Sequence, residues 1–353
     1  MHTAFEHTRP CPTGQGPRPA PASGPEPGEP PLPHPPESTT PAAASPPAPA
    51  PATLRPGHTS SPGESLPHLL LAGLALHRMA TTRQLIPLLR PDVSRPTVSA
   101  PLNKLRRLGL VDFTVLPSSH RTRVWYLTGE GARLTRDLPE LRGRPPFTVH
   151  SPEAASLKIP HTLAVLRTHL AFAADARRRG DEHGPFDWTP EVAHPIGDGE
   201  RVIADAVLHY TLTGSGGRTK LRAFLEIDRT TMSSERLATK LIDYARLFTH
   251  TPQSMTRARH HQHTATARPG PAWLRWYPVF PRVLFVLTNA SRRTLENRIS
   301  DLKAMTAQHP HVATMARTVP LGAAVLEDLE THGPYAKVWT PLVSGEPTSW
   351  AHL

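Results

Sequence analysis

Apolar and polar positions alternate along LRAFLEID, residues 221–228, and then change to helical spacing. The odd-numbered positions of this segment are apolar, and the even-numbered positions include Glu226 and Asp228. A strand would place both carboxylates on one face. A helix should follow, with an inward stripe made of Leu237, Leu241, Tyr244 and Phe248. Lys240 borders this stripe, so we expect its amine to reach back to the end of the strand.

The segment before this region, residues 65–143, shows helical patterns followed by strand patterns. Three helices are predicted in SLPHLLLAGLALHRM, ATTRQLIPLL and SRPTVSAPLNKLRRLGLV, then a hairpin in LVDFTVL and RVWYLT, and a last helix in GEGARLTRDL. Predicted caps and stops are Thr81 or Thr82, Ser94, Gly109 and Thr128. Three helices followed by a hairpin is the order of a winged helix-turn-helix. Pro101 lies inside the third helix, so this helix should be kinked or start later.

The third helix of this segment presents polar and basic side chains on its outward face. We predict DNA contacts from Arg95, Thr97, Ser99, Asn103, Lys104, Arg106 and Arg107, with His120, Arg121 and Arg123 at the hairpin tip. Hydroxyl, amide and basic groups suit phosphates and base edges. A basic surface used for protein contacts is the alternative.

The pattern after residue 152 predicts an α/β sandwich with a mixed sheet. The expected order is a long helix from Lys158, three strands in FDWTPEVAHPI, RVIADAVLHY and LRAFLEID, the helix with Lys240, a buried strand in RVLFVLTNA, and a helix capped by Ser291. A short strand is expected near Val312 to Val319. The end, GPYAKVWTPL, should be a surface segment held by Trp339.

Composition divides the chain further. Of its 43 prolines, 19 precede residue 63, so we expect residues 1–63 to be a disordered Pro/Ala-rich tail. The remaining boundaries are a DNA-binding domain at 64–143, a linker at 144–152, and an α/β domain at 153–345 with an exposed His/Arg-rich loop at 250–277. The histidines of this loop fit a solvated basic segment better than a metal site.

The net charge of +11 is concentrated in one part of the chain. Residues 65–144 hold 13 lysines and arginines against 5 carboxylates. A basic balance indicates nucleic acid as the partner. Cys11 is the only cysteine, which excludes internal disulfides. The sequence has no run of 18 apolar residues and no apolar signal core at its start, so we expect a cytoplasmic protein without membrane association.

The carboxylates and the lysine of the second region point to phosphodiester chemistry. Asp205 lies among apolar residues of one predicted strand, and Glu226 and Asp228 end the next. Carboxylates on neighbouring strands together with Lys240 suit a divalent-metal site that cuts phosphodiesters. A satisfied network of ion pairs at the sheet end is the structural alternative.

Two resemblances rest on these residues. LRRLGLV and YLTGEGA resemble the winged-helix domains of bacterial regulators. The runs ADAVLHY, FLEIDRTT and KLIDY look like the signature of the actinobacterial replication-relaxation family, over roughly residues 65 to 345. Its most specific part is the set Glu226, Asp228, Arg229, Thr231, Lys240 and Tyr244.

The second domain of that family is similar to PD-(D/E)xK nucleases, also called restriction-endonuclease-like. The resemblance implies the core order α-β-β-β-α-β and Mg²⁺ bound by Asp205 and Glu226, with Glu191 as an earlier acidic ligand. The usual lysine position is occupied by Asp228, and the resemblance implies Lys240 from the following helix as its replacement. Asp205, Glu226, Asp228 and Lys240 are thus the predicted catalytic residues. A working nuclease with a displaced lysine and a DNA-binding relic both agree with this departure.

We therefore predict a replication-relaxation protein of a plasmid, integrative element or chromosome that binds double-stranded DNA. It would act in replication, mobilisation or relaxation, as a Mg²⁺-dependent endonuclease or nickase if the second domain is active. The alternatives are a non-enzymatic winged-helix transcriptional regulator and an accessory protein of a transfer complex. A homodimer and contacts with replication or conjugation proteins are further expectations for its partners.

Overall fold

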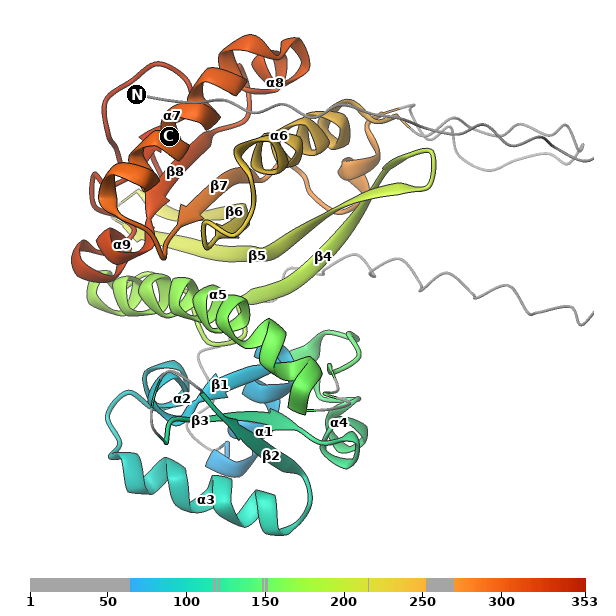
Figure 1. Ribbon diagram of the computed structural model, residues 1–353, viewed down its shortest axis with the longest axis vertical. Helices are drawn as coiled ribbons and strands as arrows, with labels where there is room; N and C mark the ends of the chain where they lie inside the picture. The colour runs from blue at the N-terminus through green and yellow to red at the C-terminus, as the bar shows by residue number, and fades with distance from the viewer. Residues whose placement is uncertain are drawn as a thin grey trace, which may run out of the picture. The chain divides into compact units, whose positions relative to one another are not determined.

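The computed structural model describes residues 64–116, 119, 121–147, 149, 152–214, 216–251 and 270–353 (Figure 1). All of them belong to one compact unit, Ala48–Leu353. The predicted tail 1–63, His120 at the hairpin tip, and residues 252–269 of the predicted His/Arg-rich loop lie outside the described residues.

The N-terminal region is built from helices and a small antiparallel sheet. Its elements are α1 (Leu66–His77), β1 (Met79–Thr81), α2 (Thr82–Leu89), α3 (Arg95–Arg107), β2 (Val111–Val115), β3 (Arg123–Leu127), α4 (Gly129–Thr135) and the 3-10 turn η1 (Pro139–Leu141). The sheet order is β1-β3-β2. The predicted helices and the β2–β3 hairpin are confirmed, whereas β1, with only three residues, was not predicted.

Local signals explain where these helices begin and end. Thr81 caps α2 in a reciprocal pair with Gln84, and Thr128 accepts a hydrogen bond from the N–H of Gly131 at the start of α4. Gly109 follows α3 with φ of 72°, a conformation that glycine adopts without steric cost. The helix α3 begins at Arg95 and continues through Pro101, so it does not start later.

The C-terminal region carries the larger sheet. Its elements are α5 (Pro152–Arg179), β4 (Trp188–Gly197), β5 (Glu200–Gly214), β6 (Gly217–Asp228), α6 (Ser234–Thr249), the 3-10 turn η2 (Ala272–Arg275), β7 (Arg282–Leu287), α7 (Arg292–Gln308), α8 (Pro310–Met315), β8 (Leu321–Val325), α9 (Leu326–His332) and β9 (Thr340–Pro341). The strand order is β4-β5-β6-β7-β8-β9. β7 is parallel to β6 and β8, and the other pairs are antiparallel, so the expected mixed sheet is confirmed.

Helices cover both faces of this sheet (Figure 1). On one face, Phe224 and Phe285 pack with Leu241 of α6 and with residues of α7 and α8. On the other, Leu225 and Leu284 pack with residues of α5 and α9. Both faces of β6 are therefore dry from Ala223 to Asp228, and a carboxylate in this part of the strand needs a partner.

The helix α5 contributes to two cores. Leu166 packs into the core of the N-terminal region, whereas Phe172 packs against the sheet of the C-terminal region. α5 also begins at Pro152, six residues before the predicted start, and it continues through Pro160. No helix in the described part of the chain is long and apolar enough to cross a membrane.

Two predictions about the last part of the chain are wrong. The segment near Val312 to Val319 forms α8 instead of a strand, because Pro310 starts a helix and Val312 and Met315 bury one side of it. The strand is β8, whose small residues gave no strand signal. The segment GPYAKVWTPL is not at the surface as predicted, because Lys337 is its one exposed residue and the others are buried or half-buried. Trp339 does hold it: this side chain has 0% exposure and donates to the carbonyl of Pro334, just before β9.

Candidate functional site

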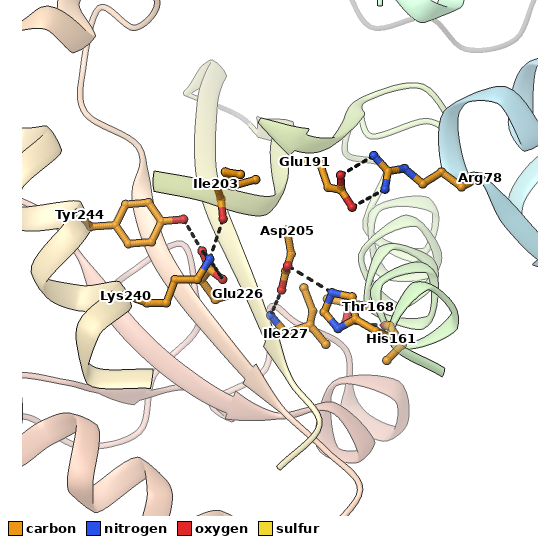
Figure 2. Close-up of polar contacts among 11 residues, drawn as sticks. Arg78, His161, Thr168, Glu191, Ile203, Asp205, Glu226, Ile227, Lys240 and Tyr244 are labelled. Carbon is orange, nitrogen blue, oxygen red and sulfur yellow. Dashed lines mark hydrogen bonds and ion pairs between the residues drawn. The ribbon is translucent and has the colours of Figure 1, made fainter. Parts of the chain in front are cut away.

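The centre of the candidate site is Glu226 of β6, which is only 2% exposed. Its Oε1 accepts a hydrogen bond of 2.6 Å from the Tyr244 hydroxyl, and Lys240 Nζ lies 3.2 Å from its Oε2 (Figure 2). Lys240 also donates to the carbonyl of Ile203 at 2.7 Å. The helical spacing of Leu237, Leu241 and Tyr244 buries this side of α6 and brings Lys240 to the strand. The predicted approach of Lys240 to the strand end is confirmed.

Burial controls the ionisation of Glu226. Desolvation, and after it the charge of Asp205, raises the pKa of Glu226 to about 8, although Lys240 and Tyr244 act in the opposite direction. Burial and the neighbouring Glu226 raise the pKa of Tyr244 well above its usual value, so this hydroxyl stays a donor. The positive charge of Lys240 therefore does not outweigh burial and the charge of Asp205, and Glu226 favours its protonated form.

Asp205 lies next to Glu226 on β5. The β5–β6 pairing runs to Ala206 and Leu225, which makes Asp205 the next position opposite Glu226. Its Oδ2 accepts from the backbone N–H of Ile227 at 2.7 Å, and its Oδ1 lies 3.2 Å from Nε2 of His161 on α5 (Figure 2). The hydrogen bond to Asp205 raises the pKa of His161 against the effect of burial.

Glu191, the third predicted metal ligand, is held by the N-terminal region. Its two carboxylate oxygens accept from the guanidinium of Arg78, which directly follows α1 (Figure 2). Both residues have positive φ, 69° for Arg78 and 45° for Glu191, an uncommon conformation for non-glycine residues. A cavity of about 30 Å³ beside this pair is lined by Arg78, Glu191, His161 and Asp205 among others, and it has room for a water molecule.

Asp228, a predicted catalytic residue, has a different environment. Its Oδ2 accepts from Nε of Arg298 at 2.7 Å, and its Oδ1 accepts from the N–H of Thr230 at 2.9 Å. The exposed fraction is 1% for Asp228 and 12% for the Arg298 side chain. The structure therefore brings Asp205, Glu226 and Lys240 together, whereas Asp228 fastens the turn after β6 to α7.

The predicted DNA-binding residues lie on the surface of the N-terminal region. Those that the structure describes are exposed, except Ser99, which is half-buried. Some are tied to the hairpin: Arg106 pairs with Asp112 at 2.8 Å, and Arg123 donates to Asn103 at 3.2 Å. Both guanidiniums also stack over Phe113. Arg95, Lys104, Arg107 and Arg121 make no ion pair within the described residues.

Sequence reasoning gave no functional role to Arg78. It lies 113 positions from Glu191, and no local pattern marks it. His161, which lies 3.2 Å from Asp205 in space, is 44 positions away from it in the sequence.

The oxygen donors at this site bear on whether it could hold a divalent cation. No three His, Cys, Asp or Glu side chains among the described residues are arranged to hold a metal ion. Asp205 and Glu226 nevertheless fit one as a pair, because they offer hard oxygen donors from neighbouring strands, and the charge of Asp205 helps to raise the pKa of Glu226. Glu191 does not fit in this conformation, because Arg78 occupies both of its oxygens.

The fold and the site define a mixed α/β protein in which a buried glutamate, Glu226, lies beside the half-buried Asp205 and a lysine. The family described as replication-relaxation matches residues 71–260, more than half of the chain, and the protein belongs to this family. The matched region runs from α1 through α6, so it contains Asp205, Glu226, Lys240 and Tyr244. Comparison with curated proteins gives no significant match, and neither does comparison with solved structures.

Proposed function

We propose that this protein binds duplex DNA through a winged helix-turn-helix formed by residues 64–143 and acts in DNA replication or relaxation. Family membership supports the biological role. The order of α1, α2 and α3 followed by the β2–β3 hairpin supports the winged-helix assignment. The observation that carries the proposal is the exposed basic face of α3, where Lys104 and Arg107 have no carboxylate partner among the described residues.

Different residues of this face have different tasks. Arg95, Lys104 and Arg107 bind phosphates, and Thr97 and Ser99 lie on the same helix within reach of base edges. Arg106 and Arg123 fix the hairpin against α3 through Asp112 and Asn103. A groove of about 590 Å³ runs beside Asn103, Arg106 and Arg107.

Salt dependence of DNA affinity tests this assignment. The double variant Lys104→Gln/Arg107→Gln should reduce the slope of log affinity against log salt by about 2, because each phosphate contact releases one counterion. The matched control is Lys303→Gln/Arg317→Gln, which removes two exposed cations of the C-terminal region. Equal slopes in the two double variants would contradict the role of α3.

We further propose that residues 153–345 form a nuclease-like domain in which Asp205 and Glu226 hold a divalent cation. The bound cation would lower the pKa of a water molecule and stabilise charge on a phosphate. Lys240 lies 3.2 Å from Oε2 of Glu226 and places a positive charge at the strand end. His161 orients Asp205, and Tyr244 holds Glu226 in position.

Cation binding can be measured without any cleavage assay. With a pKa of about 8, Glu226 is largely protonated at pH 7, so cation binding should release about one proton. Calorimetry with Mg²⁺ or Mn²⁺ in buffers of different ionisation enthalpy reports this release. Glu226→Gln should abolish it, whereas Asp198→Asn in the exposed β4–β5 turn should not. Binding without proton release would contradict the assignment of Glu226.

A non-enzymatic role is the second candidate, and one observation favours it. The carboxylates of Glu226, Asp205 and Glu191 all have protein partners already, namely Tyr244 with Lys240, His161 with the Ile227 N–H, and Arg78. A regulator or accessory protein with a degenerate nuclease fold would retain salt-sensitive DNA binding and show no proton-linked cation binding.

A further inference from the structure

Three arginines converge at the α6 side of the large sheet, outside the carboxylate site. Arg142 and Arg144 lie in the segment that follows η1, and Arg222 lies on β6. Arg142 pairs with Asp187 at 3.1 Å, and Arg144 donates to the carbonyl of Pro190 at 3.3 Å.

The strands show how these arginines are brought together. Arg222 pairs across strands with His209 of β5, and the N–H of His209 donates to the carbonyl of Asp187. Asp187 in turn holds Arg142. One local network of β4, β5 and β6 therefore positions the three guanidiniums around His209.

The positive charges of the three arginines around His209 are not balanced by carboxylates among the described residues. Burial, followed by the positive charges of Arg142, Arg222 and Arg144, lowers the pKa of His209 to about 3. Burial also lowers the pKa of Arg144 and of Arg222. Asp187 is the only carboxylate that pairs with any of the three within the described residues.

The guanidinium N–H groups of Arg144 and Arg222 also make few hydrogen bonds with the described residues. Among the described residues, Arg144 and Arg222 each donate to one backbone carbonyl, at 3.3 and 3.4 Å, although a guanidinium has five N–H donors. The half-buried Arg298 shows the usual solution, because it binds both Asp228 and a carbonyl. Arg144 and Arg222 are half-buried and Arg142 is exposed. Incompletely paired guanidiniums that are half-buried cost stability, and an anion with several acceptor oxygens would offset that cost.

We propose that Arg142, Arg144 and Arg222 bind phosphate groups of a nucleic-acid backbone, at a site separate from α3. Arginine suits this ligand because its planar donors match phosphate oxygens. Lys220 lies on the same face of β6 two residues before Arg222 and extends the basic surface. The inference rests on the proposed DNA binding, and it adds a second contact next to the sheet.

The test compares Arg222→Gln with Arg282→Gln in the full chain. The two arginines are closely matched, because each is half-buried on a strand and donates only to backbone carbonyls among the described residues. In Arg222→Gln, the dissociation constant for a duplex oligonucleotide should rise about tenfold and the salt slope should fall by about 1. Arg144→Gln should repeat this result, and Arg282→Gln should bind as the unchanged protein does.

Thermal unfolding in the presence of inorganic tripolyphosphate is the second part of the test. It should raise the midpoint of thermal unfolding of the unchanged protein and of Arg282→Gln by several degrees, and that of Arg222→Gln by much less. Loss of tripolyphosphate stabilisation with unchanged DNA affinity would overturn the nucleic-acid assignment in favour of a free phosphate. No difference between Arg222→Gln and Arg282→Gln in either arm would overturn the site altogether.

The outcomes also separate this inference from the proposed function. If the α3 double variant loses DNA affinity while Arg222→Gln does not, the cluster is wrong and the winged helix stands. If the unchanged protein binds no DNA, the proposed function and the nucleic-acid assignment both fail. The tripolyphosphate arm then decides whether the cluster holds phosphate.

Discussion

The hydroxyl of Tyr244 donates a hydrogen bond of 2.6 Å to Oε1 of Glu226, and both side chains are almost completely buried. The donor comes from α6 and the acceptor from β6, so this bond fastens the helix to the sheet at the candidate site. A buried carboxylate that has Asp205 beside it favours its protonated form. The stability of the protein should therefore depend on pH through this residue.

Replacing Glu226 by Gln should remove this dependence. The folded pKa of about 8 lies above the unfolded value of 4.5, so the folded state binds the proton more tightly. The stabilisation that this bound proton provides is fully present below pH 4.5 and is lost as the pH rises through 8, by an amount on the order of 5 kcal/mol. Urea unfolding at pH 5 and pH 9 should show Glu226→Gln gaining stability relative to the unchanged protein at pH 9. Parallel pH profiles would contradict the buried, protonated Glu226.

A group of buried histidines should produce the opposite dependence. His77 packs 5.0 Å from His169, which lies 4.9 Å from His183, measured between ring centroids. Burial lowers the pKa of His77 from 6.5 to about 4, so the unfolded state binds more protons in this interval. The contribution of neutral His77 to the free energy of unfolding is fully present above pH 6.5 and is lost as the pH falls towards 4.

The variant His77→Gln tests this expectation, because the amide can still donate to the carbonyl of Pro185. Between pH 7.5 and pH 5.5 it should lose about 1 kcal/mol less than the unchanged protein. Guanidinium unfolding at the two pH values measures the difference. An equal loss in both proteins would show that His77 is not held neutral.

The ion pair between Asp228 and Arg298 should be a stabilising element of the fold. Arg298→Ala would leave Asp228 buried without its charge partner, and we expect a loss of about 3–5 kcal/mol. Arg292→Ala is the control, because this exposed arginine of the same helix pairs with Glu296 and Asp328 on the surface. Its removal should cost less than about 1 kcal/mol. Chemical unfolding of both variants compares them, and similar losses would contradict a structural role for Asp228.

Much of the fold could be predicted because its main elements have long, regular patterns. The alternation in β6 and the stripe on α6 predicted the approach of Lys240 to the strand end. Short elements escaped prediction: β1 has three residues, and β8 consists of LGAAV, which has little strand preference. The last strand was missed because it has only two residues.

The site itself could be predicted only where its residues are close in sequence. Glu226, Lys240 and Tyr244 are joined by one strand and the next helix, so their spacing carried the information. The partners of the other carboxylates come from distant segments: Arg78 for Glu191, His161 for Asp205 and Arg298 for Asp228. Such pairs depend on tertiary packing, which local periodicity does not encode.

Nicking of supercoiled plasmid DNA by the full chain, in the presence of Mg²⁺ or Mn²⁺, tests the proposed carboxylate site most directly. The unchanged protein and the turn variant Asp198→Asn should nick the plasmid. Asp205→Asn should not, although its amide oxygen can still accept from the Ile227 N–H. Nicking that survives in Asp205→Asn would contradict the carboxylate site. Salt-sensitive DNA binding without nicking in any of the proteins would instead establish a non-enzymatic DNA-binding protein.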